Sequence, residues 1–263
     1  MNGLKVTGLS KRFGGVQALQ GVSFEASPGE CVALIGPNGA GKSTCFACLA
    51  GQQPPDAGHV SWRGQEVTGL AAAQLHTRGI NRTFQVAQVF EALTVLQNLQ
   101  LTSYIPQGLS AYLPLEHQAR EASQALLEQL GLQAVANESA LKLPYGLKKR
   151  LELGIALASR PQLLLLDEPA AGLAQEERQA LMQLVQSLTR GAQPIAVLYT
   201  EHNMDAVFGV ADRVLVLIDG QIAAQGSPAQ VAQDANVKAR YLGHSLDAWQ
   251  AKDASRAKEA SHA

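Results

Sequence analysis

A glycine-rich run early in the chain has the residue types and spacing needed to hold a polyphosphate. The run Gly36-Pro37-Asn38-Gly39-Ala40-Gly41-Lys42-Ser43-Thr44 fits the pattern G-x-x-x-x-G-K-[S/T], and the apolar strand Cys31 to Ile35 precedes it. Glycines let the backbone approach a ligand, and N–H groups at a helix start attract negative charge. We expect Lys42 to reach the β- and γ-phosphates of a nucleotide and the Ser43 hydroxyl to bind Mg²⁺. A plain turn between a strand and a helix is the alternative.

Two carboxylates at the end of a leucine run are a second candidate for chemistry. Leu163 to Leu166 is typical of a buried parallel strand, and Asp167 and Glu168 follow it. Open α/β sheets bind their ligands at this end of the strands. Asp167 is placed to hold Mg²⁺ or its water, and Glu168 to polarise an attacking water. An acidic helix cap after the strand is the alternative.

A histidine and an aromatic residue are further candidates. His202 follows the apolar strand Pro194 to Tyr199, where it could meet a γ-phosphate, although a lone histidine is usually structural or exposed. Phe13 lies in a predicted turn, Lys11 to Gly15, between strands at 4–9 and 20–26. Its ring could stack on a nucleotide base or plug the space under the turn. The residues alone leave both interpretations open.

A second glycine precedes a basic helix in the later half of the chain. Gly146, within Leu143-Pro144-Tyr145-Gly146-Leu147, comes just ahead of a helix predicted from about Lys148 to Ser159. A glycine before a helix is a potential second anion site. The basic triplet that begins this helix would more often be a solvated face.

Cysteine usage favours packing over chemistry. Cys45 and Cys48 have the C-x-x-C spacing of redox and metal sites, and Cys31 is the third cysteine of the chain. No second Cys or His pair lies near in sequence. We therefore expect all three to be small apolar packing residues on the strand and helix around the glycine-rich run.

Composition excludes several classes of protein. Of 263 residues, 46% are hydrophobic and 16% are charged, with a formal net charge of −1. These values are typical of a globular protein with a buried core. A basic stripe is absent, which gives no support for nucleic-acid binding. Neither an apolar run of membrane-spanning length nor a signal peptide is present, so we expect a cytoplasmic location with peripheral membrane association only.

The spacing of the motifs requires an insertion. Lys42 and Asp167 lie 125 residues apart, far more than a simple βαβ unit needs. Residues 94–103 and 116–130 have helical periodicity. A helical subdomain therefore separates the phosphate-binding run from the acidic strand.

Taken in order, these motifs resemble the nucleotide-binding cassette of ABC transporters over residues 4 to about 243. The matching segments are Phe13 for the base-stacking aromatic, Gly36–Thr44 for Walker A, Gln85 for the Q-loop, Leu143–Leu147 for the signature loop, Leu163–Asp167 for Walker B, Glu168 for the catalytic carboxylate and His202 for the switch histidine. The resemblance implies that ATP and Mg²⁺ are bound. It also implies that Gln85 links Mg²⁺ to the helical subdomain and that Tyr145 and Gly146 contact a nucleotide.

The resemblance also implies the architecture. The expected fold is α/β: a P-loop NTPase core with an N-terminal antiparallel β subdomain and an inserted α-helical subdomain. Residues 1–85 and 159–243 would form the core and 86–158 the helical subdomain. The resemblance does not cover residues 244–263, whose Ala, Lys, Asp, Ser and His composition predicts a disordered tail or a frayed helix.

Within this family, the residues of several segments are similar to those of the branched-chain amino-acid (and urea) uptake group. These segments are Arg82–Gln85, Leu93–Asn98, Asp167–Leu173, Tyr241–Gly243 and Tyr145 in place of the first signature glycine. The signature loop departs from the general L-S-G-G-Q pattern, because Pro144 replaces the serine and Leu147 the glutamine. Pro144 offers neither a hydroxyl nor a backbone N–H. Ala174 stands where an Asp or Asn is usual.

The resemblance implies several partners. Two cassettes would close head to tail, each ATP lying between one chain's Walker A and the other's signature loop. The weakened signature predicts that the second cassette is a different chain. Two transmembrane permease subunits would join them, with a solute-binding protein acting indirectly, at the cytoplasmic face of the inner membrane. Val86, Val89 and Phe90 would contact a permease or pack in the core.

Two other classes remain open at this stage. A soluble ABC ATPase acting on ribosomes or DNA usually carries two cassettes or a long coiled-coil insertion, and neither is present. A regulatory subunit that hydrolyses little ATP is compatible with the degraded signature.

Overall fold

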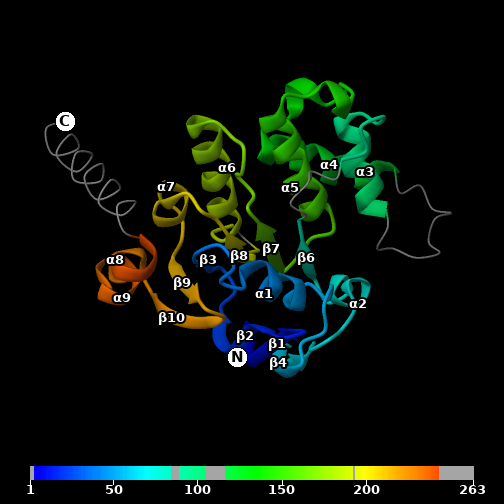
Figure 1. The fold of residues 1–263 in the computed structure, drawn as a ribbon. Helices are drawn as coiled ribbons and strands as arrows, with labels where there is room; N and C mark the ends of the chain where they lie inside the picture. Colours follow the sequence, from blue (N-terminus) through cyan, green and yellow to red (C-terminus); the bar gives the residue numbers. More distant parts are fainter. Residues whose placement is uncertain (1–2, 84–88, 105–115, 192, 243–263) are drawn as a thin grey trace, which may run out of the picture.

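The structure, a computed structural model, describes residues 3–83, 89–104, 116–191 and 193–242. Two sheets and their flanking helices make up most of it, and three further helices form a group beside them (Figure 1). Several sequence predictions concern positions outside the described residues: Gln85, Val86, Gly243 and the tail 244–263.

A six-stranded sheet forms the centre of the molecule, in the order β10-β9-β3-β8-β7-β6. All neighbouring strands run parallel except β9 and β10. The strands are β3 (Cys31–Ile35), β6 (Ile80–Arg82), β7 (Leu163–Asp167), β8 (Ala196–Thr200), β9 (Arg213–Ile218) and β10 (Gln221–Gly226). Every residue of β3, β7 and β8 is buried, which explains their unbroken apolar sequence. The predicted strands at 31–35 and 163–167 are confirmed.

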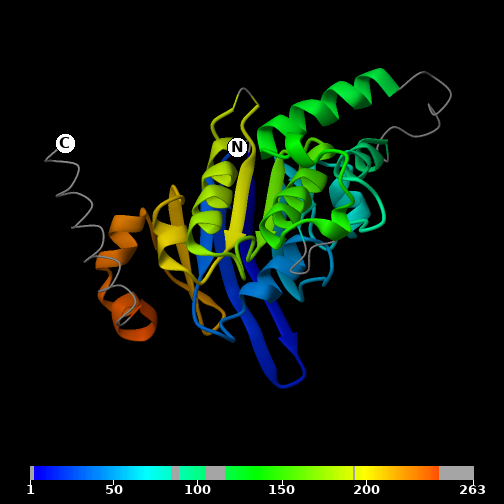
Figure 2. The same ribbon diagram turned by 90° about the horizontal axis from the view of Figure 1, so that it is seen from above.

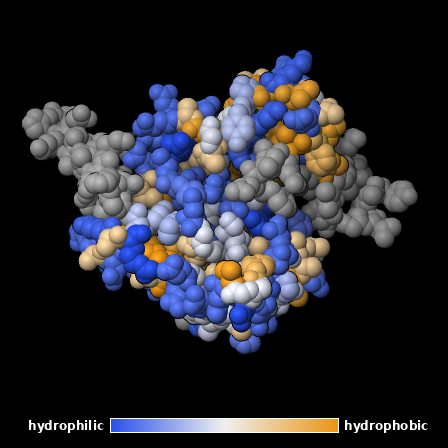
Figure 3. Space-filling model, viewed as in Figure 1, coloured by the Kyte–Doolittle hydropathy of each residue, from blue (hydrophilic) through white to orange (hydrophobic). Residues whose placement is uncertain are grey.

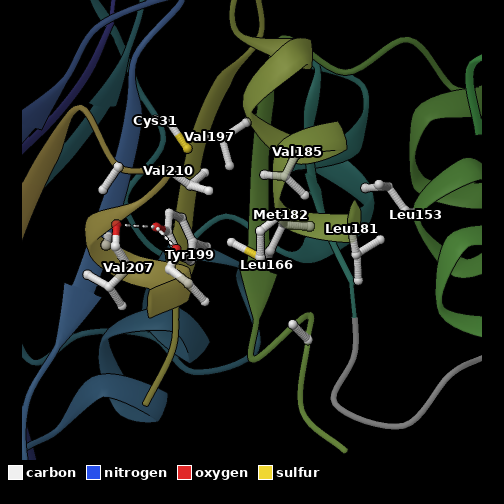
Figure 4. Close-up of a cluster of buried hydrophobic side chains, with 14 of the residues drawn as sticks. Cys31, Leu153, Leu166, Leu181, Met182, Val185, Val197, Tyr199, Val207 and Val210 are labelled. Carbon is white, nitrogen blue, oxygen red and sulfur yellow. Dashed lines mark hydrogen bonds between the residues drawn. The ribbon is translucent and has the colours of Figure 1, made fainter. Parts of the chain in front are cut away.

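The two faces of this sheet pack against different apolar layers. On one face, Leu166 and Tyr199 point toward α6 (Gln175–Leu188) and α7 (Met204–Phe208), where Met182 meets them (Figure 4). On the other face, alternate strand residues such as Leu165 pack toward α1 (Lys42–Leu49) and the second sheet. This double covering is what a parallel sheet requires.

The second sheet is antiparallel and lies near the N-terminus, in the order β2-β1-β4-β5. Its strands are β1 (Leu4–Phe13), β2 (Val16–Ala26), β4 (Ala57–Trp62) and β5 (Gln65–Glu66). The predicted turn from Lys11 to Gly15 is wrong in extent, because β1 continues to Phe13. The β1–β2 pairing continues to Phe13 opposite Val16, and the Asp56 carboxylate accepts hydrogen bonds from Lys11 Nζ (2.9 Å) and Arg12 N–H (2.7 Å) beside it. In Figure 2 the blue hairpin β1–β2 extends beyond the rest of the sheet.

Three helices, α3 (Val95–Tyr104), α4 (Glu116–Leu130) and α5 (Tyr145–Ala158), pack on one another beyond the β6 edge of the central sheet (Figures 1 and 2). Gly154 allows this close approach, because a Cβ there would lie 2.4 Å from Leu130 Cδ1. Two 3-10 turns, Gln133–Val135 and Ala140–Lys142, link α4 to α5. The predicted helical insertion is confirmed, while its bounds at 86 and 158 stay a prediction.

The remaining elements close the fold around the central sheet. Asp219 and Gly220 join β9 to β10 in a two-residue hairpin with φ angles of 48° and 76°, a turn that Asp-Gly pairs favour. Short helices α2 (Ala72–His76), α8 (Pro228–Gln233) and α9 (Ala235–Val237) follow other strands, and a π-helical turn spans Lys238–Leu242. The Ser227 hydroxyl caps α8 as expected for Ser-Pro.

Exposed large apolar residues concentrate in two places. Phe90, Leu101, Leu141 and Tyr145 lie in or beside the helical group, and Figure 3 shows apolar residues gathering on that part of the surface. The other place is the β1–β2 hairpin. Among the described residues, no helix is both long and apolar enough to span a membrane.

Candidate active site

The carboxyl ends of the central strands open into a cleft of about 440 Å³ that gathers most of the predicted site. The cleft connects the glycine-rich run, β2, the end of β7, the segment after β8 and the β9–β10 turn. Its lining residues are Val16, Gln17, Ala18, Gln20, Asn38, Gly39, Gly41, Lys42, Ser43, Thr44, Glu168, His202, Asp219 and Gly220. Residues far apart in sequence therefore share one pocket.

Two glycines of the run hold positions that no other residue can occupy. A Cβ on Gly36 would lie 2.0 Å from Leu217 O, and one on Gly41 would lie 2.4 Å from Ala18 O. Gly41 also has a φ of 103°, which disfavours other residues. These glycines let the run wrap tightly between β2 and β9, with α1 beginning at Lys42.

Lys42 lies across its own loop. Its Nζ donates hydrogen bonds to Gly36 O (2.7 Å) and Pro37 O (3.0 Å). Burial lowers the pKa of this ammonium, while the negative charges of Glu168 and Asp167 raise it. A cation held by two carbonyls at the mouth of a helix can exchange them for phosphate oxygens.

The β9–β10 turn supports the loop, a contact that local sequence did not predict. Gly220 N–H donates to Ala40 O (3.0 Å), and Gln20 N–H donates to Gly220 O (2.8 Å). The turn residue Asp219 also lines the cleft. A hairpin signal is visible in the sequence, but its place beside the loop follows only from the pairing of β3 with β9.

Glu168 and His202 meet directly. His202 Nε2 lies 2.7 Å from Glu168 Oε1, and both side chains retain access to the cleft. The strands β7 and β8 are parallel neighbours with Asp167 opposite Thr200, so residues after each strand end adjacent to one another. The structure thus brings together the two polar groups predicted at these strand ends.

Asp167 is buried at the end of β7, and its predicted role in holding Mg²⁺ or its water stays a prediction. It is 4% exposed and does not line the cleft. Its Oδ2 forms an ion pair with Arg82 Nη2 (2.7 Å), and its Oδ1 accepts the Thr200 hydroxyl (2.7 Å). Arg82 was not predicted as a site residue, although it ends strand β6 as Asp167 ends strand β7.

The oxygen donors at this site fit Mg²⁺. The Ser43 hydroxyl lines the cleft, and the Asp167 carboxylate lies at the end of β7, one residue before the cleft-lining Glu168. Mg²⁺ is usually bound by one or two protein oxygens together with substrate phosphates and waters. Within the described residues, no group of three or more His, Cys, Asp or Glu could hold a metal alone. A shared site with nucleotide phosphates is consistent with both observations.

Phe13 is not a plug under the hairpin. Its side chain is 46% exposed, and Lys11 Nζ lies 5.6 Å from its ring centroid. The ring does not line the cleft, but its cross-strand partner Val16 does. An exposed aromatic beside the cleft entrance is available for stacking on a base.

Phe13→Ala is expected to weaken ATP affinity by about fivefold or more, since stacking on an aromatic is worth roughly 1–3 kcal/mol per base. Direct titration with ATP measures the effect, and Phe13→Tyr serves as the control because it keeps the ring. Equal affinities for the wild type and the alanine variant would exclude stacking.

Tyr145 and Gly146 lie at the start of α5 and do not line this cleft. The prediction that Gly146 precedes its helix is wrong, because α5 begins at Tyr145 with Pro144 as its N-cap. Gly146 lies in the first turn, where a Cβ would be 2.5 Å from Glu177 Oε1. The Tyr145 hydroxyl donates to Ala171 O at 3.4 Å.

The cysteines are packing residues, as predicted. All three are buried and free. Burial raises the pKa of the Cys31 thiol to about 12 and that of Cys48 to about 11, and it raises the pKa of Cys45 further. Thiols of this kind are poor nucleophiles at neutral pH.

A family model described as ABC transporter matches residues 19–171, from β2 through the glycine-rich run to the residues after Glu168. The chain belongs to the ABC transporter family. ATP hydrolysis coupled to transport is the activity of this family's cassettes, and the cleft holds the phosphate loop, carboxylate and histidine in one place.

Relatives of this ABC cassette align over nearly the whole chain. The high-affinity branched-chain amino acid transport ATP-binding protein LivG of Escherichia coli (strain K12) is 40% identical over 249 residues. The alignment covers 91% of this chain and 97% of LivG.

Solved ABC cassettes have the same fold. A nucleotide-free ATP-binding cassette from an ABC transporter superposes with a TM-score of 0.81 at 32% identity, covering 92% of this chain and all (100%) of that one. A cassette in its ADP conformation gives a TM-score of 0.80 at 32% identity, covering 92% and 99%. The expected P-loop NTPase fold is confirmed.

Proposed function

We propose that this chain is the ATP-binding and ATP-hydrolysing subunit of an importer for branched-chain amino acids or a related small polar solute. The cleft that joins Lys42, Ser43, Glu168 and His202 carries the ATPase part of the proposal. The alignment across 97% of LivG, a branched-chain amino acid transport protein, supports the solute class. Peripheral attachment to the cytoplasmic face of the inner membrane through permease subunits follows from this function.

The cleft residues Lys42, Ser43, Glu168 and His202 each have a proposed role. Lys42 and the N–H groups from Gly36 to Thr44 bind the β- and γ-phosphates. Ser43 and Asp167 would hold Mg²⁺, Asp167 acting through a bound water because Arg82 and Thr200 occupy its oxygens. The metal would neutralise part of the negative charge of the phosphates.

Glu168 is proposed to orient the attacking water and to accept its proton. His202 is proposed to contact the γ-phosphate. Its imidazole shares a hydrogen bond with the Glu168 carboxylate. Gln85, which lies outside the described residues, is proposed to connect Mg²⁺ with the helical subdomain. Closure around the nucleotide would exclude bulk water and strengthen these contacts.

The test is transport by the complete assembly. The chain is purified from membranes with its bound partners, which mass spectrometry identifies, and the complex is placed in liposomes. ATP-dependent uptake of leucine, isoleucine or valine is the expected result, with ADP-loaded liposomes as the control. Co-purification with ribosomes or DNA and without a membrane partner would contradict the proposal.

Phe90, next to the helical subdomain, has an exposed side chain that a membrane partner can reach. Phe90 is 51% exposed, whereas Val89 is partly buried against the core. We assign the permease contact to Phe90 and a packing role to Val89. The sequence left permease contact and core packing equally open for this segment. The exposed fractions favour contact for Phe90 and packing for Val89.

A second, different cassette is proposed to complete the site. Tyr145 and Gly146 do not line their own chain's cleft, and Pro144 caps α5 without a side-chain hydrogen bond. In a head-to-tail dimer they would face the partner's ATP, while this chain's Lys42 and Glu168 would act on the other. A heterodimer confines the weakened signature to one site.

Unequal turnover at the two sites is the expected outcome. Each hydrogen bond missing from a charged phosphate costs about 1.5–3 kcal/mol, which slows the partner's site by roughly ten- to a hundredfold. Replacing the catalytic glutamate of one cassette at a time separates the sites. Glu168→Gln should remove most turnover and the partner's equivalent change little; a fully active purified homodimer would contradict the asymmetry.

A further inference from the structure

The backbone at Glu168 is strained. Its φ is 48°, in the left-handed region that residues other than glycine, asparagine and aspartate seldom adopt. Such a conformation persists only where the surrounding structure over-determines it, and it concentrates at functional sites. The question is which groups hold it.

The first group is the Thr200 hydroxyl. Thr200 is 1% exposed at the end of β8, and its Oγ1 accepts a hydrogen bond from Glu168 N–H (3.0 Å). The same hydroxyl donates to Asp167 Oδ1 (2.7 Å). One buried side chain therefore fixes the backbone on the N-terminal side of Glu168 and the carboxylate before it.

The second group is the Glu201 carboxylate, 4% exposed. Its Oε1 accepts from Ala170 N–H (3.1 Å), and its Oε2 accepts from His202 N–H (3.1 Å). Glu201 thus joins the turn after Glu168 to the histidine segment. Ala171 N–H closes the same turn by donating to Glu168 O (3.1 Å).

We propose that Thr200 and Glu201 are positioning residues that hold Glu168 in its left-handed conformation and set its contact with His202. Neither side chain lines the cleft, so both act through the backbone that carries the catalytic pair. The inference rests on the proposed role of Glu168 in hydrolysis. It adds that the end of β8 determines where the Glu168 carboxylate points.

The first measurement compares isosteric and conservative changes at Thr200, in the full-length chain purified as the complex with its partner subunits. Thr200→Val keeps the shape but removes both hydrogen bonds, and should lower kcat at least tenfold with ATP affinity unchanged within about twofold. Thr200→Ser keeps the hydroxyl and should recover most of the rate. Thr189→Val is the matched control, because Thr189 is buried at the end of α6 and bonds only Gln186 O.

The second measurement does not depend on turnover. Amide hydrogen exchange at Glu168 should accelerate at least tenfold in Thr200→Val, because that amide loses its acceptor. In Glu201→Gln, exchange at Ala170 or at His202 should accelerate likewise, because glutamine keeps one acceptor oxygen for the two amides. Amides of β3 should exchange as in the wild type. The glutamine change also serves if the valine variant fails to fold.

The outcomes separate this inference from the proposed function. If wild type turns over ATP and Glu168→Gln does not, while Thr200→Val keeps the wild-type kcat, the positioning role is wrong and the function stands. A loss of ATP affinity equal to the loss of kcat would also overturn it, since that pattern is one of general structural damage. If Glu168→Gln itself keeps full turnover, the proposed role of Glu168 fails first.

Discussion

Glu168→Gln is expected to leave ATP binding intact and to reduce ATP turnover by at least about a hundredfold. Glutamine keeps the size of the side chain but cannot accept a proton from the attacking water. Losing one such group costs at least ~2.7 kcal/mol of transition-state stabilisation. Binding survives because the phosphate contacts come from Lys42 and the loop amides, on the other side of the cleft.

Phosphate release and equilibrium ATP binding, measured on the complex with its partner subunits, test this expectation. Glu176→Gln is the matched control, because Glu176 is an exposed carboxylate in the first turn of α6, outside the cleft. Turnover in Glu168→Gln within threefold of the wild type would remove Glu168 from the catalytic role. A parallel loss of ATP binding would show that the glutamine change disturbs the loop.

Lys42→Ala is expected to abolish tight ATP binding. The Lys42 ammonium lines the cleft, and each charge-assisted hydrogen bond that it would lose to a phosphate is worth about 1.5–3 kcal/mol. Two lost contacts weaken binding at least about a hundredfold. The change also removes the bonds from Lys42 Nζ to Gly36 O and Pro37 O, so part of the effect is loss of loop order.

Titration with a non-hydrolysable ATP analogue measures the loss of affinity, and thermal unfolding without nucleotide measures the loss of loop order. Lys5→Ala is the control, because Lys5 forms an exposed ion pair with Glu25 on the antiparallel sheet. Unchanged analogue affinity in Lys42→Ala would contradict the phosphate role. A large drop in unfolding temperature without nucleotide would assign the effect to the loop bonds instead.

The parts of the fold that the sequence predicts best are those with local causes. Leu163 to Asp167 forms the expected strand because a fully buried parallel strand needs an unbroken apolar run. The α5 helix begins at Tyr145 and not at about Lys148 as predicted, so Gly146 lies inside its first turn and not ahead of it. The absent Cβ of Gly146 makes room for the Glu177 carboxylate of α6. That requirement comes from packing between helices, which local sequence cannot display.

The site, too, has residues that local sequence predicts and contacts that it does not predict. Lys42, Glu168 and His202 could be predicted because polar residues after apolar strands meet at one sheet edge. The ion pair of Arg82 with Asp167 and the bond from Gly220 to Ala40 could not, because each joins segments whose pairing depends on strand order. The roles of Phe13, Tyr145 and Gly146 stay predictions, because none of the three lines the cleft.

The position of β3 has a consequence for the order of events during synthesis. This strand lies between β8 and β9, and the loop that follows it rests on the β9–β10 turn. The phosphate loop leaves the ribosome early, but its two flanking strands and its supporting turn come from residues 196–220, more than 150 residues later. Because non-local strand pairing must await all its partners, a nascent chain can complete its nucleotide site only after residues 196–220 have been synthesised. Until then, the Gly36–Thr44 run lacks the β9–β10 turn that supports it and both strands that flank β3.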